Sequence, residues 1–345
     1  MRRKERLPEL LAPAGNYECL CAALTGGANA VYIGGKRFSA RAYAGNFEMS
    51  EIRRAAEYAH TRGASLYVTL NTLLSDGEIP DAVDYARELY SSGVDALIVA
   101  DLGAAEKIHT RVPGLSLHAS TQMSVNNTAG EELAARLGMQ RVVLARELSI
   151  DNIRAAVEKC PVEIEVFLHG ALCVSHSGQC LFSSLVGGRS GNRGECAQPC
   201  RLPYGTGNGK NPYPLSLRDL SLAGHIPALI SSGVASLKIE GRMKSADYVY
   251  GVTKIYRALI DENRAATQEE CEILRRLFSR GGFTDGYFTG KIAVGMCGIR
   301  TETDKAESRT APAGKYGEIP TPAAAEIKIE AGAPASLTLS AAGKS

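Results

Sequence analysis

Four cysteines within 28 residues are the feature of the chain best suited to chemistry. Cys173, Cys180, Cys196 and Cys200 are separated by six, fifteen and three residues. Zinc sites usually pair their ligands with about two to four residues inside each pair, so this spacing does not match them. Four thiolates are the usual ligand set of an iron–sulfur cluster. The spacing therefore favours a cluster, and a zinc site or four uncoordinated thiols are the alternatives.

The composition sets the surroundings in which these thiols work. The chain has 345 residues, 45% of them hydrophobic and 22% charged, with a formal net charge of +2. That charge neither demonstrates nor excludes a nucleic-acid partner. No apolar stretch approaches the roughly 20 residues of a membrane span, and the basic start lacks the apolar run of a secretory signal. We expect a cytoplasmic protein without membrane contact, in which clustered cysteines serve metal or redox chemistry rather than disulfides.

Short apolar runs alternate with helical patterns and must position the cysteines. Eight runs rich in Val, Ile and Leu are predicted as buried parallel strands: 9–12, 30–33, 65–70, 96–100, 115–119, 141–144, 163–168 and 236–239. Eight such units within about 250 residues predict an α/β fold of the (β/α)8, or TIM-like, barrel type, with the cysteine-rich loop after strand seven. A doubly wound open sheet is the alternative, although no Gly-x-Gly-x-x-Gly motif follows the first strand.

Polar residues follow most of these strands. In a barrel the carboxyl ends of the strands share one face, where active sites lie. The residues expected there are Asn16, Asn71, Asp101, Gln122, Arg146, Glu147, His169, Glu240 and Arg242. Each could equally satisfy the backbone at a strand end, so the prediction of a pocket wall rests on the set.

Two charged or titratable features lie within the strands themselves. His169 ends strand seven, four residues before Cys173, as either a proton carrier or a structural histidine. Glu165 interrupts the same apolar strand and needs a partner inside a barrel. Strand eight lies next to strand seven in a closed barrel, so Lys238 is the expected partner, in a structural ion pair rather than a catalytic one.

The composition changes after residue 290. Residues 1–290 are predicted to form the barrel, with a cluster loop at 170–204. Residues 291–322 are rich in Thr, Glu, Lys, Pro and Gly and indicate a linker or extended excursion. Residues 323–345 alternate apolar and polar side chains around a Gly-Ala-Pro turn, which predicts a β-hairpin and the start of a β-rich extension.

At the cysteines the sequence resembles the peptidase U32 family, also called collagenase-like proteases. The similar blocks are ELLAPAGNYECLCAAL (9–24), GANAVYIGG (27–35), HASTQMSVNN (118–127), EVFLHGALCVSHSGQCLFSS (165–184), GNRGECAQPCRLPY (191–204) and SLKIEGRMKS (236–245). The family was named for proteolysis, but its better understood members are oxygen-independent hydroxylases of RNA bases or ubiquinone precursors. They carry a [4Fe-4S] cluster on four cysteines, with prephenate implicated as hydroxyl donor.

The resemblance implies ligand roles for Cys173, Cys180, Cys196 and Cys200. Some members recruit a more remote cysteine, and many have Asp-Leu-Cys where this chain has a serine, Ser221. The implied reaction is hydroxylation of a tRNA wobble uridine or a 23S rRNA cytidine, with RNA and a small anionic co-substrate as partners.

If the chain is such a hydroxylase, the remaining candidates for catalysis and substrate binding lie on the barrel face. His169, Glu240 and Arg242 are the catalytic candidates. The candidates for substrate binding, including the cations that would meet carboxylates, are Arg41, Asn71, Gln122, Arg146 and Lys238. A peptidase and a non-catalytic subunit of a hydroxylase complex are the rival hypotheses. The need for a protein partner or a homo-oligomer stays open.

Overall fold

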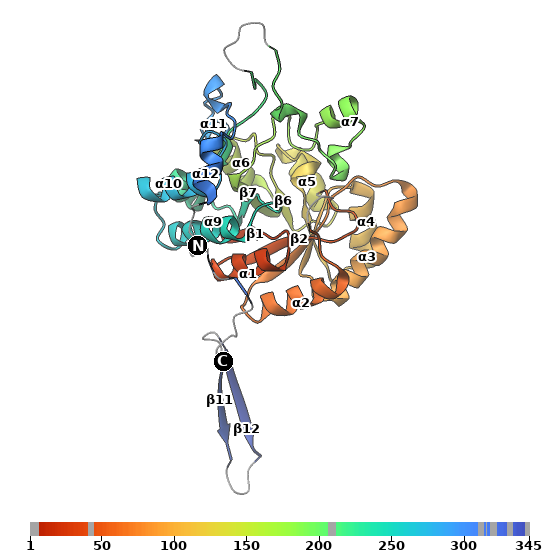
Figure 1. Ribbon diagram of the computed structural model, residues 1–345. Helices are drawn as coiled ribbons and strands as arrows, with labels where there is room; N and C mark the ends of the chain where they lie inside the picture. Colours follow the sequence, from red (N-terminus) through yellow and green to blue (C-terminus); the bar gives the residue numbers. More distant parts are fainter. Residues whose placement is uncertain are drawn as a thin grey trace.

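Eight parallel strands close into a barrel in the computed structural model of the chain (Figure 1). The structure describes residues 7–40, 45–205, 212–309, 314, 316–317, 323–329 and 334–341. The barrel strands are β1 Glu9–Pro13, β2 Ala30–Gly34, β3 Ser65–Leu70, β4 Ala96–Val99, β5 Ser116–Ala119, β6 Arg141–Val143, β7 Glu163–Gly170 and β9 Ser236–Ile239. Each strand pairs with the next, and β9 pairs with both β7 and β1. The predicted (β/α)8 fold is confirmed, and an open sheet is excluded.

Helices surround the barrel wall and connect the strands. They are α1 Tyr17–Thr25, α2 Met49–His60, α3 Ile79–Ser91, α4 Leu102–Arg111, α5 Thr128–Arg136, α6 Ile150–Lys159, α8 Ile226–Ser232 and α9 Ala246–Asp261. Side-chain caps fix several of their first turns. Asn16 caps α1 through a 2.8 Å bond from the Cys19 amide to its Oδ1. The α2 helix begins at Met49, and Glu51 accepts a bond from the Glu48 amide at 2.8 Å.

Two packing layers follow from the alternation of side chains along each strand. One set of positions, including Leu10, Val31 and Val68, packs outward against the helices in the large apolar core. The alternate set forms a small separate cluster inside the barrel: Leu11, Ala30, Tyr32, Tyr67, Ala96 and Ile98.

Charged side chains complete the barrel interior. The Lys238 Nζ lies 2.9 Å from the Glu165 Oε1, which confirms the predicted pair. Arg141 was not anticipated, and its guanidinium binds Glu165 at 3.2 Å and Glu9 at 2.6 Å. Burial would raise the pKa of Glu165, but attraction to Lys238 and Arg141 outweighs burial and holds that pKa at about 2. The glutamate is therefore charged and shared between two cations.

Two short strands extend the sheet beyond the barrel. β8 Asp219–Ser221 runs antiparallel to the end of β7, pairing His169 with Ser221 and Gly170 with Leu220. β10 Phe283–Thr284 pairs with β8 in parallel. The cysteine loop thus leaves the barrel at β7 and re-enters beside its own starting point.

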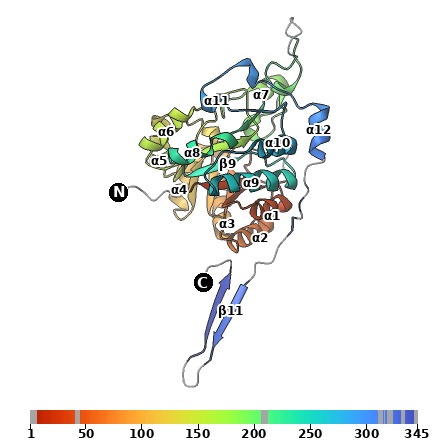
Figure 2. The same cartoon turned by 90° about the vertical axis from the view of Figure 1, so that its left-hand side faces the viewer.

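The segment after α9 covers one side of the barrel and then departs from it. It contains α10 Gln268–Leu277, α11 Gly286–Thr289 and α12 Glu302–Arg309. α12 lies within the segment expected to be extended, and it binds α10 through Arg275, which pairs with Glu307 at 2.8 Å. The strands β11 Ala323–Lys328 and β12 Ser336–Ala341 pair in antiparallel fashion and project away from the barrel in both views (Figures 1 and 2). Among the described residues, no helix has the length and apolar character to cross a membrane.

Candidate functional site

The cysteine loop is braced at both of its ends by one arginine. Arg201 donates to the Leu172 carbonyl at 2.7 Å, where the loop begins. It also donates to the Ser216 hydroxyl at 3.0 Å and to the Leu217 carbonyl, where the loop returns. These backbone contacts hold Cys200, the neighbour of Arg201, close to the carboxyl end of β7.

Further contacts dock the loop across the carboxyl ends of β3 and β5. Arg193 pairs with Glu78 at 2.7 Å and donates to the Leu73 carbonyl at 2.7 Å. Ser124 donates to the Ser177 carbonyl at 2.5 Å. Gly178 has φ +80°, and any side chain there would collide with the Gln122 carbonyl. The sequence therefore permits a close approach of the two loops that only glycine allows.

Two of the four cysteine thiols, Cys173 and Cys200, are affected by neighbouring cysteines of the loop. All four are free thiols. Burial raises the pKa of Cys173, and its neighbours Cys180 and Cys200 add to the rise, whereas Arg146 opposes it. Burial likewise raises the pKa of Cys200, with Arg201 opposing and Cys196 and Cys180 adding to the rise.

The donor set fits a thiolate-ligated cluster in chemistry and in charge. Four thiols are the usual ligands of such a cluster, and Arg146 and Arg201 favour the anionic forms of Cys173 and Cys200 respectively. Over the part of the chain that the structure describes, no three side chains of His, Cys, Asp or Glu converge as they would around a single metal ion.

Arg146 and Glu240 meet at the mouth of the barrel, as the placement at strand ends predicted. Their side chains form an ion pair of 2.9 Å. The Arg146 guanidinium also lies 4.0 Å from the centroid of the Phe167 ring. Its backbone amide bonds the Ser177 hydroxyl at 3.3 Å, and that hydroxyl donates to Glu147 at 3.0 Å. This pair therefore connects the barrel mouth to the cysteine loop.

Arg242 lies deeper, at 4% exposure. Its Nη1 donates to the hydroxyls of Ser39 at 3.0 Å and Thr69 at 3.2 Å. A side chain at Gly34 would collide with this guanidinium. Asn71 accepts a 3.0 Å bond from the Ala40 amide and so orders the segment that carries Ser39. Arg41, another expected substrate-binding residue, lies outside the described residues.

Two of the candidates occupy the interior rather than an open face. His169 is 1% exposed, and its ring packs against Tyr248, Tyr256 and Phe283. Burial lowers the pKa of His169 to about 3, and its Nδ1 lies 3.1 Å from the Tyr256 hydroxyl. Lys238 is 4% exposed and bound to Glu165. Both placements favour the structural interpretation of these residues.

Lys244 lies beside His169 and was not among the expected residues. Burial, with repulsion from Arg280, lowers the pKa of Lys244 to about 7. Its Nζ lies over the Phe278 ring, which follows α10. The sequence carried no signal for this, because α10 and the Lys244 turn meet only in the folded chain.

Comparison with known proteins identifies the family. The profile described as Peptidase family U32 matches residues 15–296. The chain belongs to the peptidase U32 family. It is 41% identical over 286 residues to the 23S rRNA 5-hydroxycytidine C2501 synthase of Escherichia coli, covering 81% of this chain and 42% of that protein.

Other curated members of the U32 family carry different names. The chain is 40% identical to tRNA hydroxylation protein P1 of Bacillus subtilis, covering 82% of this chain and 71% of the relative. It is 35% identical to a protein named collagenase in Porphyromonas gingivalis, covering 82% and 74%. The chain thus spans less than half of the rRNA synthase and about seven tenths of the other two.

Two cavities of this U32 barrel border the cysteine loop. The smaller, of about 230 Å³, is lined by Lys36, Phe38, Ser39, Gly45, Asn46, Thr72 and Arg193. The buried Thr72 hydroxyl lines it without a hydrogen-bond partner in the described chain. The larger, of about 640 Å³, lies between the ends of β4 and β5 and the loop, and Gln122 is in its wall.

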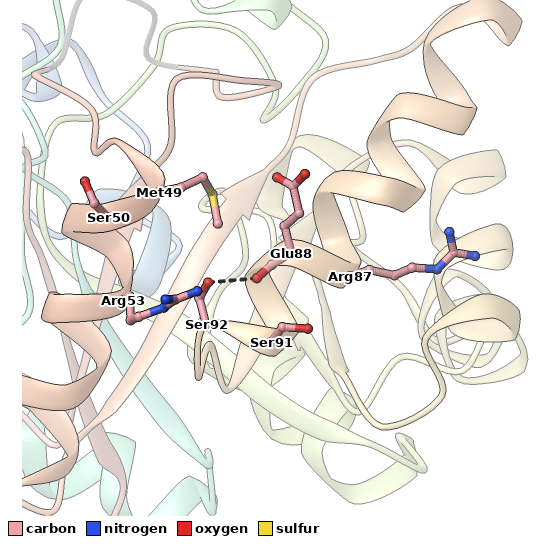
Figure 3. A pocket seen from close by; sticks show the side chains of 7 residues that line it. All are labelled: Met49, Ser50, Arg53, Arg87, Glu88, Ser91 and Ser92. Carbon is pink, nitrogen blue, oxygen red and sulfur yellow. Dashed lines mark hydrogen bonds between the residues drawn. The ribbon is translucent and has the colours of Figure 1, made fainter.

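A third cavity lies on the outside of the U32 barrel, between α2 and α3 (Figure 3). It encloses about 530 Å³ and is lined by Met49, Ser50, Arg53, Arg87, Glu88, Ser91 and Ser92. The Ser92 hydroxyl donates to the Glu88 carbonyl at 2.8 Å, a bond within one helix. None of the predicted site residues lines this cavity.

Proposed function

We propose that this U32 chain hydroxylates a base of RNA, either a tRNA wobble uridine or a 23S rRNA cytidine, by oxygen-independent chemistry. Relatives at about 40% identity are named for tRNA hydroxylation and for synthesis of a 23S rRNA 5-hydroxycytidine, and each is aligned over about four fifths of this chain. The observation that carries the proposal is the closure of the cysteine loop over the carboxyl ends of the strands, where barrels hold their substrates.

A [4Fe-4S] cluster is the proposed cofactor, with Cys173, Cys180, Cys196 and Cys200 as its ligands. When bound, the cluster supplies electron transfer or a Lewis-acidic iron. The chain's own part is to hold four thiolates together and to offset their negative charge. Arg201 does so from within the loop, and its bonds to backbone carbonyls keep it in place without neutralising it.

A small anionic co-substrate, prephenate-like in its carboxylates, is proposed for the 230 Å³ cavity. Lys36 and Arg193 line the cavity beside the carboxylates of Glu48, at 3.6 Å, and Glu78, at 2.7 Å, and an anionic ligand would share these two cations with them. The Ser39 and Thr72 hydroxyls contribute hydrogen-bonding groups. Arg242 donates to Ser39 from behind the wall, so it positions that hydroxyl. This refines the expected role of Arg242 from direct contact to positioning, and it leaves Lys238 and Arg146 in ion pairs.

At the barrel mouth, Glu240 is proposed as the group that accepts or returns a proton, with Arg146 orienting its carboxylate from 2.9 Å. His169 is proposed to be structural, because its buried ring is neutral and enclosed by aromatic side chains. We place the reaction in the cytoplasm, where RNA and reduced thiols coexist.

Mass spectrometry of nucleosides from tRNA and rRNA tests the proposal. Cells that lack the gene should lose one hydroxylated pyrimidine, and the wild-type gene should restore it while a Cys173→Ser gene should not. Unchanged hydroxylation in all three strains would overturn the proposed reaction.

Peptide hydrolysis is the second candidate, because one relative at 35% identity is named collagenase. Gelatin cleavage by the purified chain should then disappear in Cys173→Ser and His169→Ala variants. Cleavage that persists in both variants would show a contaminating protease.

A further inference from the structure

The 640 Å³ cavity is a groove with an unusual mixture of side chains. Four of its wall residues are exposed leucines: Leu73, Leu102, Leu133 and Leu181. Five others are side-chain amides: Gln122, Asn126, Asn127, Gln179 and Asn192. Among the described residues that line the groove, none is Lys or Arg, and Asp101 is the one carboxylate. The groove is therefore apolar where the leucines line it, and polar but almost uncharged where the amides line it.

Asp101 does not contribute a free charge to the groove. Its Oδ1 accepts the Ala104 amide at 2.8 Å and caps α4. Its Oδ2 accepts the Leu74 amide at 3.1 Å. Both oxygens therefore accept a backbone donor, and the carboxylate serves to fix the start of α4 and the Leu74 backbone.

Some amides hold the walls together, whereas others are available. Asn127 caps α5 through the Gly130 amide at 3.0 Å, and Gln179 donates to Ser124 at 2.7 Å. Ser124 has φ +59°, in the left-handed region, which non-glycine residues adopt at a cost and often at functional sites. By contrast, the side chains of Gln122 and Asn192 make no hydrogen bond with the part of the chain that the structure describes.

The groove adjoins the cysteine site directly. Gln179 and Leu181, two of its wall residues, flank Cys180 in the sequence. The loop cannot move away freely, because Ser124 and Gly178 fix its contact with the end of β5. A ligand in the groove therefore lies beside the segment of the loop that carries Cys180.

We infer that this groove binds a nucleobase from a single-stranded RNA loop, with Gln122 and Asn192 hydrogen-bonding its edge. A base has an apolar face and a neutral edge of donors and acceptors, which matches leucines and amides and not a phosphate. A cavity of this volume accommodates a ligand of that size. Neutral amides next to apolar walls also discriminate between bases, because a wrong edge leaves a buried amide unpaired. The inference rests on the proposed function and names the residues that set its specificity.

Photocrosslinking tests the groove without relying on turnover. A short stem-loop RNA with 4-thiouridine in its loop is irradiated with the full chain, and crosslinked peptides are mapped. We expect crosslinks within 122–134 and 178–192 for the stem-loop, and their loss when the same sequence is annealed to its complement. Crosslinks confined to other segments would overturn the inference, as would equal crosslinking of the duplex.

Matched variants separate the groove from the rest of the loop. Leu181 is 58% exposed and lines the groove, whereas Leu185 is 82% exposed on α7 Phe182–Gly187 and does not. Gln122→Ala, Asn192→Ala and Leu181→Ala should each weaken stem-loop binding by about tenfold, equivalent to roughly 1.4 kcal/mol. Leu185→Ala and Gln268→Ala should leave binding unchanged. Equal affinities for all five variants would refute the assignment.

The same experiments distinguish failure of the groove from failure of the proposed function. If deletion of the gene abolishes a hydroxylated nucleoside while Gln122→Ala, Asn192→Ala and Leu181→Ala all retain it, the reaction stands and the groove assignment falls. If the groove crosslinks RNA but deletion changes no nucleoside, the groove stands and the reaction falls.

Discussion

The Glu165 carboxylate and the Lys238 ammonium lie 2.9 Å apart inside the barrel, on the two strands that complete its closure. Neither side chain reaches solvent to any extent, with exposures of 0% and 5%. Arg141 shares the same carboxylate from β6. One glutamate therefore contacts two buried cations, of which Arg141 also binds Glu9, so its removal affects more than a single pair.

Replacement of Glu165 should destabilise the fold strongly. Glu165→Ala leaves Lys238 and Arg141 without a shared anion, and we expect a loss of about 3–5 kcal/mol in the free energy of unfolding. Urea titration followed by circular dichroism measures it. Glu158→Ala, on the exposed face of α6, is the control and should stay within about 0.5 kcal/mol of wild type. Equal urea midpoints for the two variants would contradict the role of the pair.

The same residue makes stability depend on acid pH. The pKa of Glu165 is held at about 2, below its ordinary value of 4.5. Between those values the unfolded chain binds the proton and the folded chain does not, so stability falls as pH falls through this window. Urea midpoints of wild type and Glu165→Gln, measured from pH 5 to pH 2, should converge. A constant gap across the series would show that Glu165 is not the titrating group.

Arg193 should hold the cysteine loop on the barrel. It bonds Glu78 and the Leu73 carbonyl at the end of β3. Arg193→Ala should speed hydrogen exchange in residues 171–205 while changing global stability by less than about 1 kcal/mol, because the pair is largely solvated. Arg87→Ala removes a comparable pair with Asp84 on α3 and should leave loop exchange unchanged. Faster exchange throughout the barrel would mean that Arg193 supports the whole fold instead.

The cysteine loop should carry all of the bound iron. Anaerobically purified wild type should contain about four irons per chain with the absorption of a brown cluster. Cys180→Ser and Cys196→Ser should each lower the iron content and change the spectrum. Cys271→Ser lies on α10, outside the loop, and should keep both. Zinc without iron in the wild-type protein would contradict the proposed cofactor.

Lys244 should destabilise the protein at neutral and acid pH. Its folded pKa of about 7 lies below its ordinary value of 10.5, because burial and Arg280 disfavour the charge. Between pH 7 and 10.5, Lys244 is protonated in the unfolded chain and neutral in the folded one. Its contribution to the free energy of unfolding therefore becomes more favourable as pH rises from 7 to 10.5. Lys244→Met should raise the thermal midpoint at pH 7 by more than it does at pH 10. Lys254→Met, on exposed α9 surface, should show no such difference.

Most of the barrel was predictable because its strands are buried on both faces. Apolar runs such as 65–70 and 236–239 can be predicted as strands from their own residues, and their bounds match those observed. β8 and β10 have three and two residues, too few for any periodicity, and they exist only because β7 offers a free edge. The short helix α12 was missed because its stability comes from Arg275 on α10, a contact that composition does not reveal.

The candidate site was also predictable only in part. The four cysteines are close in sequence, so their spacing alone suggested a shared ligand set, and that assignment stays a prediction. The Glu165–Lys238 pair followed from strand order in a closed barrel. Arg141 was missed because it required knowing which face of β6 points inward. Most residues that line the 640 Å³ groove were not predicted, because they come from four separate loops that only the fold brings together.

The pairing of β7 with β8 has a consequence for how the protein is made. Because His169 and Gly170 pair with Ser221 and Leu220, the barrel closes behind the cysteine loop, and its apolar core does not include the four thiols. Small zinc domains, in contrast, stay unfolded until their metal arrives. With the proposed iron–sulfur cluster, biogenesis of this chain would proceed in two stages, in which a finished scaffold then receives its cluster. Iron starvation would in that case leave a folded pool that is ready to be loaded, rather than aggregates.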